Sequence, residues 1–216
     1  MEKSKLLVSD CIKFGWKTFK ARPWFFVVTV IIYAIVQVIV GAMGGGILGF
    51  LVSILLPTLL YCGVIHVYLK AHDNVSSPKL KELWNPKPFL NYLLVSILIG
   101  VIVLVGLVLL IVPGIILALV FSMAGFLVIE KNMKPIEALK ESARMTKGSR
   151  WKLFLLGLAL TGLTILGMIP LMLGLFIVAP LSMLALVHAY RTLSGGAMMP
   201  VAEKVETEAS APIATA

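Results

Sequence analysis

The stretch PFLNYLLVSILIGVIVLVGLVLLIVPGIILALVFSMAGFLVI, residues 88–129, contains no Asp, Glu, Lys or Arg and decides the fold class. Two further stretches without these charges occupy residues 23–69 and 153–190. A helix crosses the bilayer core with about 20 apolar residues, so each stretch is long enough for two spans. The chain is 60% hydrophobic and 13% charged, which excludes a soluble domain because such a domain needs more charge to cover its surface. The sequence predicts an all-α integral membrane protein with six transmembrane helices.

Turn-forming residues interrupt each uncharged stretch near its middle. These interruptions are GAMGGG at 41–46, VPG at 112–114 and GMIP at 167–170. Gly and Pro favour turns, so each stretch is expected to fold as a helical hairpin within a single membrane domain, residues 1–193. The predicted spans are 24–41, 47–69, 89–110, 113–129, 152–168 and 172–192.

The net charge of +9 is confined to the segments between the hairpins and at the chain ends. Residues 1–22 carry a net +4, residues 70–87 +2 and residues 130–152 +4, whereas the tail from residue 191 carries −1. Lys and Arg mark the cytoplasmic side of membrane proteins. We therefore predict a multi-pass protein of the cytoplasmic (inner) membrane with both termini in the cytoplasm. Its small, acidic tail, residues 194–216, is predicted to be disordered.

Two of the charged segments are amphipathic. An interfacial helix is predicted at 4–22 and a cytoplasmic amphipathic helix at 135–147. A helix with an apolar face opposite a basic face is typical of the membrane interface. Each presents three basic residues as candidate contacts for anionic lipids: Lys13, Lys17, Lys20, Lys140, Arg144 and Lys147. The alternative is that these residues only set topology and solubility. Nucleic-acid binding is not expected, because no recognised motif accompanies the basic residues.

A weak internal repeat is visible in the sequence. Trp16, Trp84 and Trp151 precede the three predicted hairpins at nearly equal spacings. The second and sixth spans also end alike, in HVYLK at 66–70 and HAYR at 188–191. These features indicate three parallel repeats, or they reflect the ordinary placement of Trp, Tyr and basic residues at membrane interfaces.

No catalytic residue, cofactor site or metal site is predicted. Gln37 is the strongest polar group inside a span, and an interhelical hydrogen bond is its expected role. His66 and His188 lie near the inner ends of spans but lack further metal ligands at a suitable spacing. Cys11 and Cys62 are expected to be reduced structural thiols.

Four motifs, taken in order, resemble a known group of proteins. They are VPGII at 112–116, EALKES at 137–142, KGSRWKLF at 147–154 and YRTLSG at 190–195. In this order they resemble a prokaryotic family of six-helix integral membrane proteins of uncharacterised function. That family is similar to the membrane domain of membrane-anchored glycerophosphodiester phosphodiesterases. The resemblance covers about residues 112–195 and implies a fold and a membrane location, whereas the phosphodiesterase catalytic domain has no counterpart in this chain.

The sequence leads to two hypotheses of function. The first is a non-enzymatic inner-membrane protein that organises or associates with lipid, with a membrane-protein partner or with further copies of itself. The second is a transporter or channel for a small uncharged or apolar solute, suggested by six spans that contain several prolines.

Overall fold

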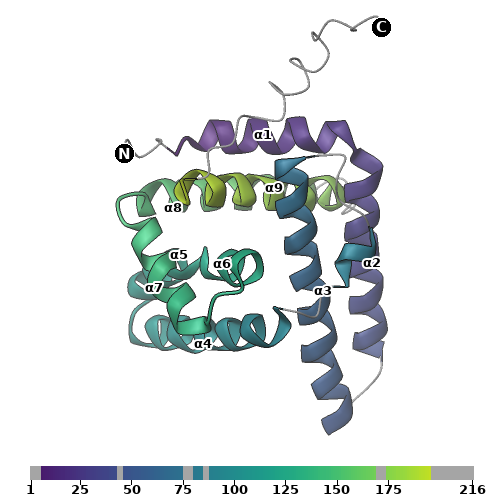
Figure 1. Cartoon of the computed structure of the whole chain (residues 1–216), viewed down its shortest axis with the longest axis horizontal. Helices are drawn as coiled ribbons and strands as arrows, with labels where there is room; N and C mark the ends of the chain where they lie inside the picture. Colours follow the sequence, from purple (N-terminus) through teal and green to yellow (C-terminus); the bar gives the residue numbers. More distant parts are fainter. Residues whose placement is uncertain (1–5, 43–45, 75–79, 85–87, 169–173, 196–216) are drawn as a thin grey trace, which may run out of the picture.

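The computed structural model describes residues 6–42, 46–74, 80–84, 88–168 and 174–195 (Figure 1). These residues form helices and connecting turns, and no strand occurs among them. In chain order the elements are α1 Val8–Ala21, α2 Pro23–Ala42, α3 Ile47–Asp73, the 3₁₀ helix η1 Leu80–Leu83, α4 Phe89–Leu109, α5 Ile111–Phe121, α6 Ala124–Lys131, α7 Pro135–Thr146, α8 Arg150–Met168 and α9 Leu175–Leu193. The predicted tail, 194–216, lies almost wholly outside the described residues.

Six helical segments are long and apolar enough to cross a membrane. They are Pro23–Ala42, Leu51–Asp73, Phe89–Leu109, Ile111–Lys131, Arg150–Met168 and Leu175–Leu193. The prediction of six apolar helices in an all-α protein is confirmed, with ends that differ by a few residues. The largest difference at an end is in α3, which continues to Asp73, well beyond the predicted end of the second span at residue 69.

The fourth predicted span, 113–129, is confirmed as one apolar segment, Ile111–Lys131, but its helix is interrupted by a short turn. It consists of α5 and α6, separated by a turn at Ser122 and Met123. The Ser122 hydroxyl donates a hydrogen bond to the carbonyl of Leu119 at 2.8 Å, a local bond that competes with the regular helical pattern. The carbonyl of Val120 accepts a hydrogen bond from Ser142 of α7 instead, at 2.8 Å. The break is therefore stabilised by a helix distant in sequence.

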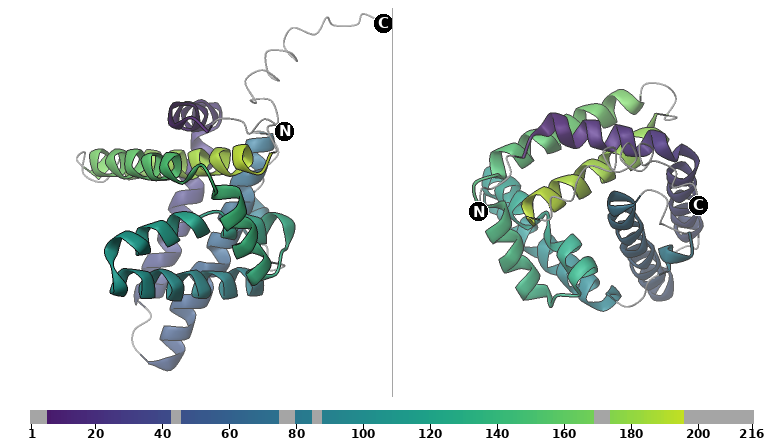
Figure 2. Two further views of the ribbon diagram at one scale, coloured as in Figure 1. Left: turned by 90° about the vertical axis from the view of Figure 1, so that its left-hand side faces the viewer. Right: turned by 45° about the horizontal axis from the view of Figure 1, so that its top comes forward.

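The spans pack in successive pairs, α2 with α3, α4 with α5 and α8 with α9. Figure 2 (right) shows the three pairs arranged around the middle of the molecule. The close approach of α4 and α5 depends on two glycines. A Cβ added to Gly106 would lie 3.0 Å from the Cα of Gly114, so larger residues would push the helices apart.

A short helix precedes each pair and docks on a different pair. α1 packs on α9, η1 on α3, and α7 on α4, α5 and α6. Glycine permits two of these contacts. A Cβ at Gly15 would lie 2.9 Å from the carbonyl oxygen of Leu181, and a Cβ at Gly63 would overlap the main chain of Leu83. The three short helices thus link the three pairs into a closed ring.

The buried core is concentrated toward one end of the helices. Tyr68, Tyr190 and Phe26 are among its largest fully buried side chains. The connection between α4 and α5 is exposed and apolar, with Val108 79% and Leu110 69% exposed. Apolar surface of this extent faces another apolar phase in a stable protein, and a bilayer supplies one.

Candidate functional site

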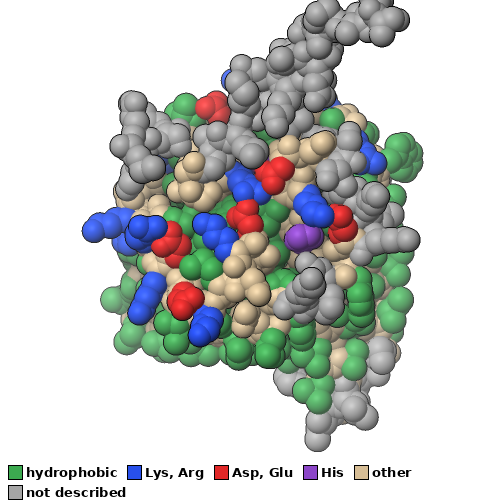
Figure 3. All heavy atoms as spheres, in the orientation of Figure 1, with side chains coloured by type: hydrophobic (Ala, Val, Ile, Leu, Met, Phe, Trp, Pro, Cys, Tyr) green, Lys and Arg blue, Asp and Glu red, His purple; other side chains and the backbone are tan. Residues whose placement is uncertain are grey.

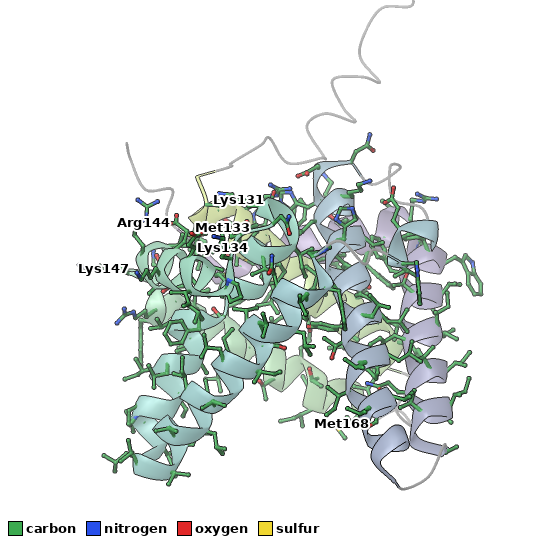
Figure 4. All side chains as sticks on the ribbon, turned by 60° about the horizontal axis from the view of Figure 1, so that its bottom comes forward. Lys131, Met133, Lys134, Arg144, Lys147 and Met168 are labelled. Atoms are coloured by element: carbon green, nitrogen blue, oxygen red, sulfur yellow. The ribbon has the colours of Figure 1, made fainter. Side chains whose placement is uncertain are left out.

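The charged end of the protein combines side chains from several helices. Figure 3 shows acidic, basic and histidine side chains together on one face, with hydrophobic side chains around them. Figure 4 places the labelled Lys131, Lys134, Arg144 and Lys147 at the same end of the protein, and Met168, the last residue of α8, toward the opposite end. The charged groups in these views therefore occupy one end of the helices.

Arg191 of α9 is the centre of an ion-pair network. Its Nη2 donates to Oδ2 of Asp73 in α3 at 2.6 Å, and its Nη1 donates to Oε1 of Glu130 in α6. The hydroxyl of Tyr190 donates to the second oxygen of Glu130. The Arg191 side chain is 18% exposed and that of Glu130 is 22% exposed, so water screens the pairs only in part. The network joins three helices that are distant in sequence, α3, α6 and α9.

A pair of histidines lies beside this network. Nε2 of His72 is 3.2 Å from Nδ1 of His188, and Nδ1 of His72 is 3.5 Å from Oδ1 of Asp73. The ring of Phe14 from α1 contacts both imidazoles, with centroids 4.6 and 4.4 Å away. Nδ1 of His72 is buried and makes no hydrogen bond with any described residue, although the Asp73 carboxylate lies near it. The histidines therefore connect α1 to the ion pairs of α3 and α9.

Sequence reasoning missed this cluster because the predicted second span ended at residue 69. That end placed His72 and Asp73 in a loop, and it singled out His66 instead as the counterpart of His188. The helical pattern of α3 in fact continues to Asp73. Among the described residues, no group of three His, Cys, Asp or Glu side chains is arranged to hold a metal ion.

The α1 helix presents the three predicted basic residues on its exposed face. Lys13, Lys17 and Lys20 are exposed, and the Nζ of Lys20 lies 5.0 Å from the centre of the Trp16 ring. The opposite face, which includes Cys11, Gly15 and Phe19, is buried. Burial raises the pKa of the Cys11 thiol to about 11. The sequence predicted an apolar face in contact with the membrane interface; the structure covers much of that face with α9.

The α7 helix has the same construction. Lys140, Arg144 and Lys147 are exposed, whereas Ser142 and Thr146 are buried against α5. The Ser142 hydroxyl donates to the carbonyl of Val120 at 2.8 Å, whereas the Thr146 hydroxyl donates to the carbonyl of Ser142 at 2.9 Å and lies 3.4 Å from that of Val120. Arg144 donates to both carboxylate oxygens of Glu141, at 2.8 and 2.6 Å. This hydrogen bonding lowers the pKa of Glu141 below its ordinary value.

Gln37 lies on α2, away from the charged end. Its amide donates to the hydroxyl of Tyr33 at 3.0 Å, one turn earlier on the same helix. The predicted interhelical bond of Gln37 stays a prediction. Tyr33 contacts the ring of Tyr61 in α3 at 6.1 Å, and Tyr61 contacts Tyr92 in α4 at 6.3 Å.

A groove of about 280 Å³ lies between α2 and α9. Its lining is wholly apolar and consists of Ile31, Ala34, Ile35, Val38, Ile39 and Phe176. The lining of the groove therefore includes no ionisable side chain.

Cys11 and Cys62, the two cysteines of the chain, are both buried free thiols.

Comparison with known proteins gives one match. Residues 101–196, less than half of the chain, match a family model described as "Protein of unknown function (DUF975)". This region runs from α4 to just beyond α9 and includes α7 and Arg191. No curated protein and no solved structure matches the chain. The similarity to glycerophosphodiester phosphodiesterase membrane domains stays a prediction.

Proposed function

We propose that this chain is a non-enzymatic, multi-pass protein of the inner membrane that gathers anionic lipid at the cytoplasmic face. The observation that carries the proposal is the construction of α1 and α7. Each exposes three basic side chains while its opposite face is packed on the spans. The basic residues are thereby held at the charged end of the helices instead of on free segments.

The proposed topology has both termini in the cytoplasm and three helical hairpins in the bilayer. The position of Lys131, Lys134, Arg144 and Lys147 at one end in Figure 4 supports this orientation, because Lys and Arg accumulate on the cytoplasmic side. The exposed Trp24 and Trp151, each the second residue of a span, support it further, because Trp is enriched at membrane–water interfaces. A reporter fused after Arg191 should be cytoplasmic, and an external reporter would refute the six-span topology.

Electrostatics favours lipid as the ligand. A basic side chain near an anionic bilayer surface contributes about 1 kcal/mol of attraction. Six such residues on two docked helices would enrich anionic lipid around the protein at little entropic cost to the backbone, since the backbone is already ordered. A membrane-protein partner or a second copy of the chain with an acidic surface would be attracted by the same charges.

The test is the composition of the lipid that surrounds the protein. The protein is reconstituted in phosphatidylglycerol and phosphatidylethanolamine and extracted in polymer-bounded discs, and the lipids are quantified. We expect phosphatidylglycerol enrichment that is lost when the six basic residues of α1 and α7 are replaced by Gln. A control variant, Lys131→Gln, Lys134→Gln and Arg150→Gln, removes exposed charge outside these faces and should retain the enrichment. Enrichment that persists in the six-residue variant would refute the lipid role.

A transporter or channel for a small uncharged or apolar solute is the second candidate. The break between α5 and α6 within a single apolar segment favours it, because broken spans often form transport sites. The Val120 carbonyl at this break already accepts a hydrogen bond from Ser142. Solute flux into proteoliposomes that is abolished by filling this break, for example with Ala124→Leu, would favour transport, whereas the lipid role predicts no flux.

A further inference from the structure

The segments that contain α1 and α7 share one layout, a short amphipathic helix followed by a span, and are here called the first and second copy. Val8 and Pro135 begin the two short helices, and Pro23 and Arg150 begin the spans that follow. The interval from Val8 to Pro135 equals the interval from Pro23 to Arg150, so the two segments align in sequence without a gap. This register pairs Trp24 with Trp151, whereas the sequence spacing had suggested Trp16 as the partner.

The buried positions of the two helices correspond in this register. Gly15 pairs with Ser142, and both lie against a main-chain carbonyl of the helix on which they dock. A Cβ on Gly15 would lie 2.9 Å from the oxygen of Leu181, and Ser142 donates to the oxygen of Val120. The buried Cys11 and Phe19 likewise pair with the buried Ala138 and Thr146.

The exposed basic positions correspond as well. Lys13, Lys17 and Lys20, here named the first triad, pair one to one with the second triad, Lys140, Arg144 and Lys147. All six side chains are exposed, and each triad ends four residues before its exposed Trp. The identity of the buried residues differs between the copies, whereas the three positive charges of each triad and the Trp correspond. This difference indicates that the exposed face, rather than the packing, limits what these positions accept.

We propose that each triad is a separate site for one phosphodiester headgroup of an anionic phospholipid in the cytoplasmic leaflet. The inference rests on the proposed function and adds the number and place of the lipids. Residues at i, i+4 and i+7 share one helix face and span about 10 Å along its axis, and Lys147 is the C-cap residue directly after α7, so the three flexible side chains of each triad reach one headgroup. Ammonium and guanidinium groups form strong charge-assisted hydrogen bonds to phosphate oxygens. The Trp that follows each triad sets the depth, since its ring occupies the headgroup level of a bilayer.

The two sites differ in strength. Glu141 in the second copy occupies the position of Phe14 in the first, and Arg144 is bonded to it. Between the first residue of the short helix and the Trp, the first copy carries a net +3 and the second a net +2. The first triad is therefore the tighter site, and Glu141→Gln strengthens the second about fivefold, the equivalent of one unopposed charge.

The test counts retained lipids by native mass spectrometry of the whole chain in detergent titrated with phosphatidylglycerol. Lys13→Gln with Lys17→Gln and Lys20→Gln removes the first triad; Lys140→Gln with Arg144→Gln and Lys147→Gln removes the second. The expected counts are two lipids for the unaltered protein, one for each triple variant and none for the six-residue variant. Each triad's loss weakens its site about a hundredfold. Far-UV circular dichroism confirms that each variant is folded, and a triple variant that unfolds is replaced by the single Lys17→Gln or Arg144→Gln variant, which should weaken the lipid at its own triad about fivefold and leave the other unchanged.

A control variant and a soluble competitor, glycerol phosphate, distinguish two separate lipid sites from a general effect of charge and from binding of free phosphate. The Lys131→Gln, Lys134→Gln, Arg150→Gln variant removes the same number of charges at positions whose equivalents in the first copy are not basic, and it should retain both lipids. Loss of a lipid in this control, or loss of both lipids in one triple variant, would overturn the assignment of two separate sites. Displacement of both lipids by millimolar glycerol phosphate alone would overturn the assignment to membrane lipid. If the six-residue variant still enriches anionic lipid in discs, the proposed function fails. If that variant loses the enrichment but the two triple variants do not each lose one lipid, only the present inference fails.

Discussion

Replacing Arg191 should destabilise the protein more than any substitution at its exposed basic residues. Arg191→Gln removes the cation that Asp73 and Glu130 share. It leaves two carboxylates at the junction of α3, α6 and α9 without that partner. The substitution keeps a polar side chain of moderate length, so the main effect is electrostatic.

The magnitude follows from exposure. Removing one partner of a fully buried ion pair costs about 3–5 kcal/mol. Here the side chains of Arg191, Glu130 and Asp73 are 18, 22 and 41% exposed, so water screens part of the loss. We expect the free energy of unfolding to fall by about 2–3 kcal/mol. Arg191→Lys should cost about half as much, since one ammonium group cannot reproduce the fork that bonds both carboxylates.

The assay is reversible unfolding in mixed micelles, followed by far-UV circular dichroism. Arg144→Gln is the matched control, because the Arg144 side chain is 78% exposed and its pair with Glu141 should contribute nothing measurable. Glu130→Gln in the Arg191→Gln background removes one of the two carboxylates that share the cation, so the double variant should lose less stability than the two single losses together. The reasoning is refuted if Arg191→Gln has the stability of the control, or if the two single losses simply add.

Two further predictions concern packing. Gly63→Ala should lower the free energy of unfolding by about 1–3 kcal/mol, because the new Cβ overlaps the main chain of Leu83 and forces η1 away from α3. The control is Gly157→Ala, whose Cβ has nothing within 4 Å and which should leave the free energy of unfolding unchanged or raised. Equal effects of the two substitutions would contradict this account. In a Cys62→Ser background, Cys11 should react with a maleimide at pH 8 about a hundredfold more slowly in the folded than in the unfolded protein, because burial raises its pKa to about 11 and depletes the thiolate. Equal rates in the two states would show that α1 leaves α9 readily.

The six apolar helices could be predicted from sequence because their signal is local. Uncharged stretches long enough for two spans, each interrupted by Gly and Pro, identify spans without knowledge of their neighbours. The sequence signal that determines where each span ends is not local. Asp73 and Glu130 belong to helices because Arg191, distant in sequence, neutralises them there. Ending a predicted span at the last apolar residue therefore separated the ion-pair network from the helices that form it.

The break between α5 and α6 was missed for a related reason. Ser122 is a weak signal by itself, since Ser also occurs inside membrane helices with its hydroxyl bonded to the preceding turn. What makes the turn at Ser122 and Met123 stable is the hydroxyl of Ser142, which no local pattern of α5 indicates. The basic residues were found more readily than the ion-pair network because exposed amphipathic faces follow the helical period directly.

The register proposed for the α1 and α7 segments indicates which sequence features carry structural information in this protein. Trp16, Trp84 and Trp151 are spaced almost evenly, but interfaces select Trp whether or not segments are related. The interval between the first residues of α1 and α7 equals the interval between the first residues of α2 and α8. In that register the two basic triads coincide. Packing could not have revealed this register, because Gly15 and Ser142 meet their partner carbonyls by different means, one by close approach and the other by a hydrogen bond. A pair of helices that differ in how they pack but agree in where they place positive charge is the pattern expected when the shared constraint is an anionic ligand outside the protein.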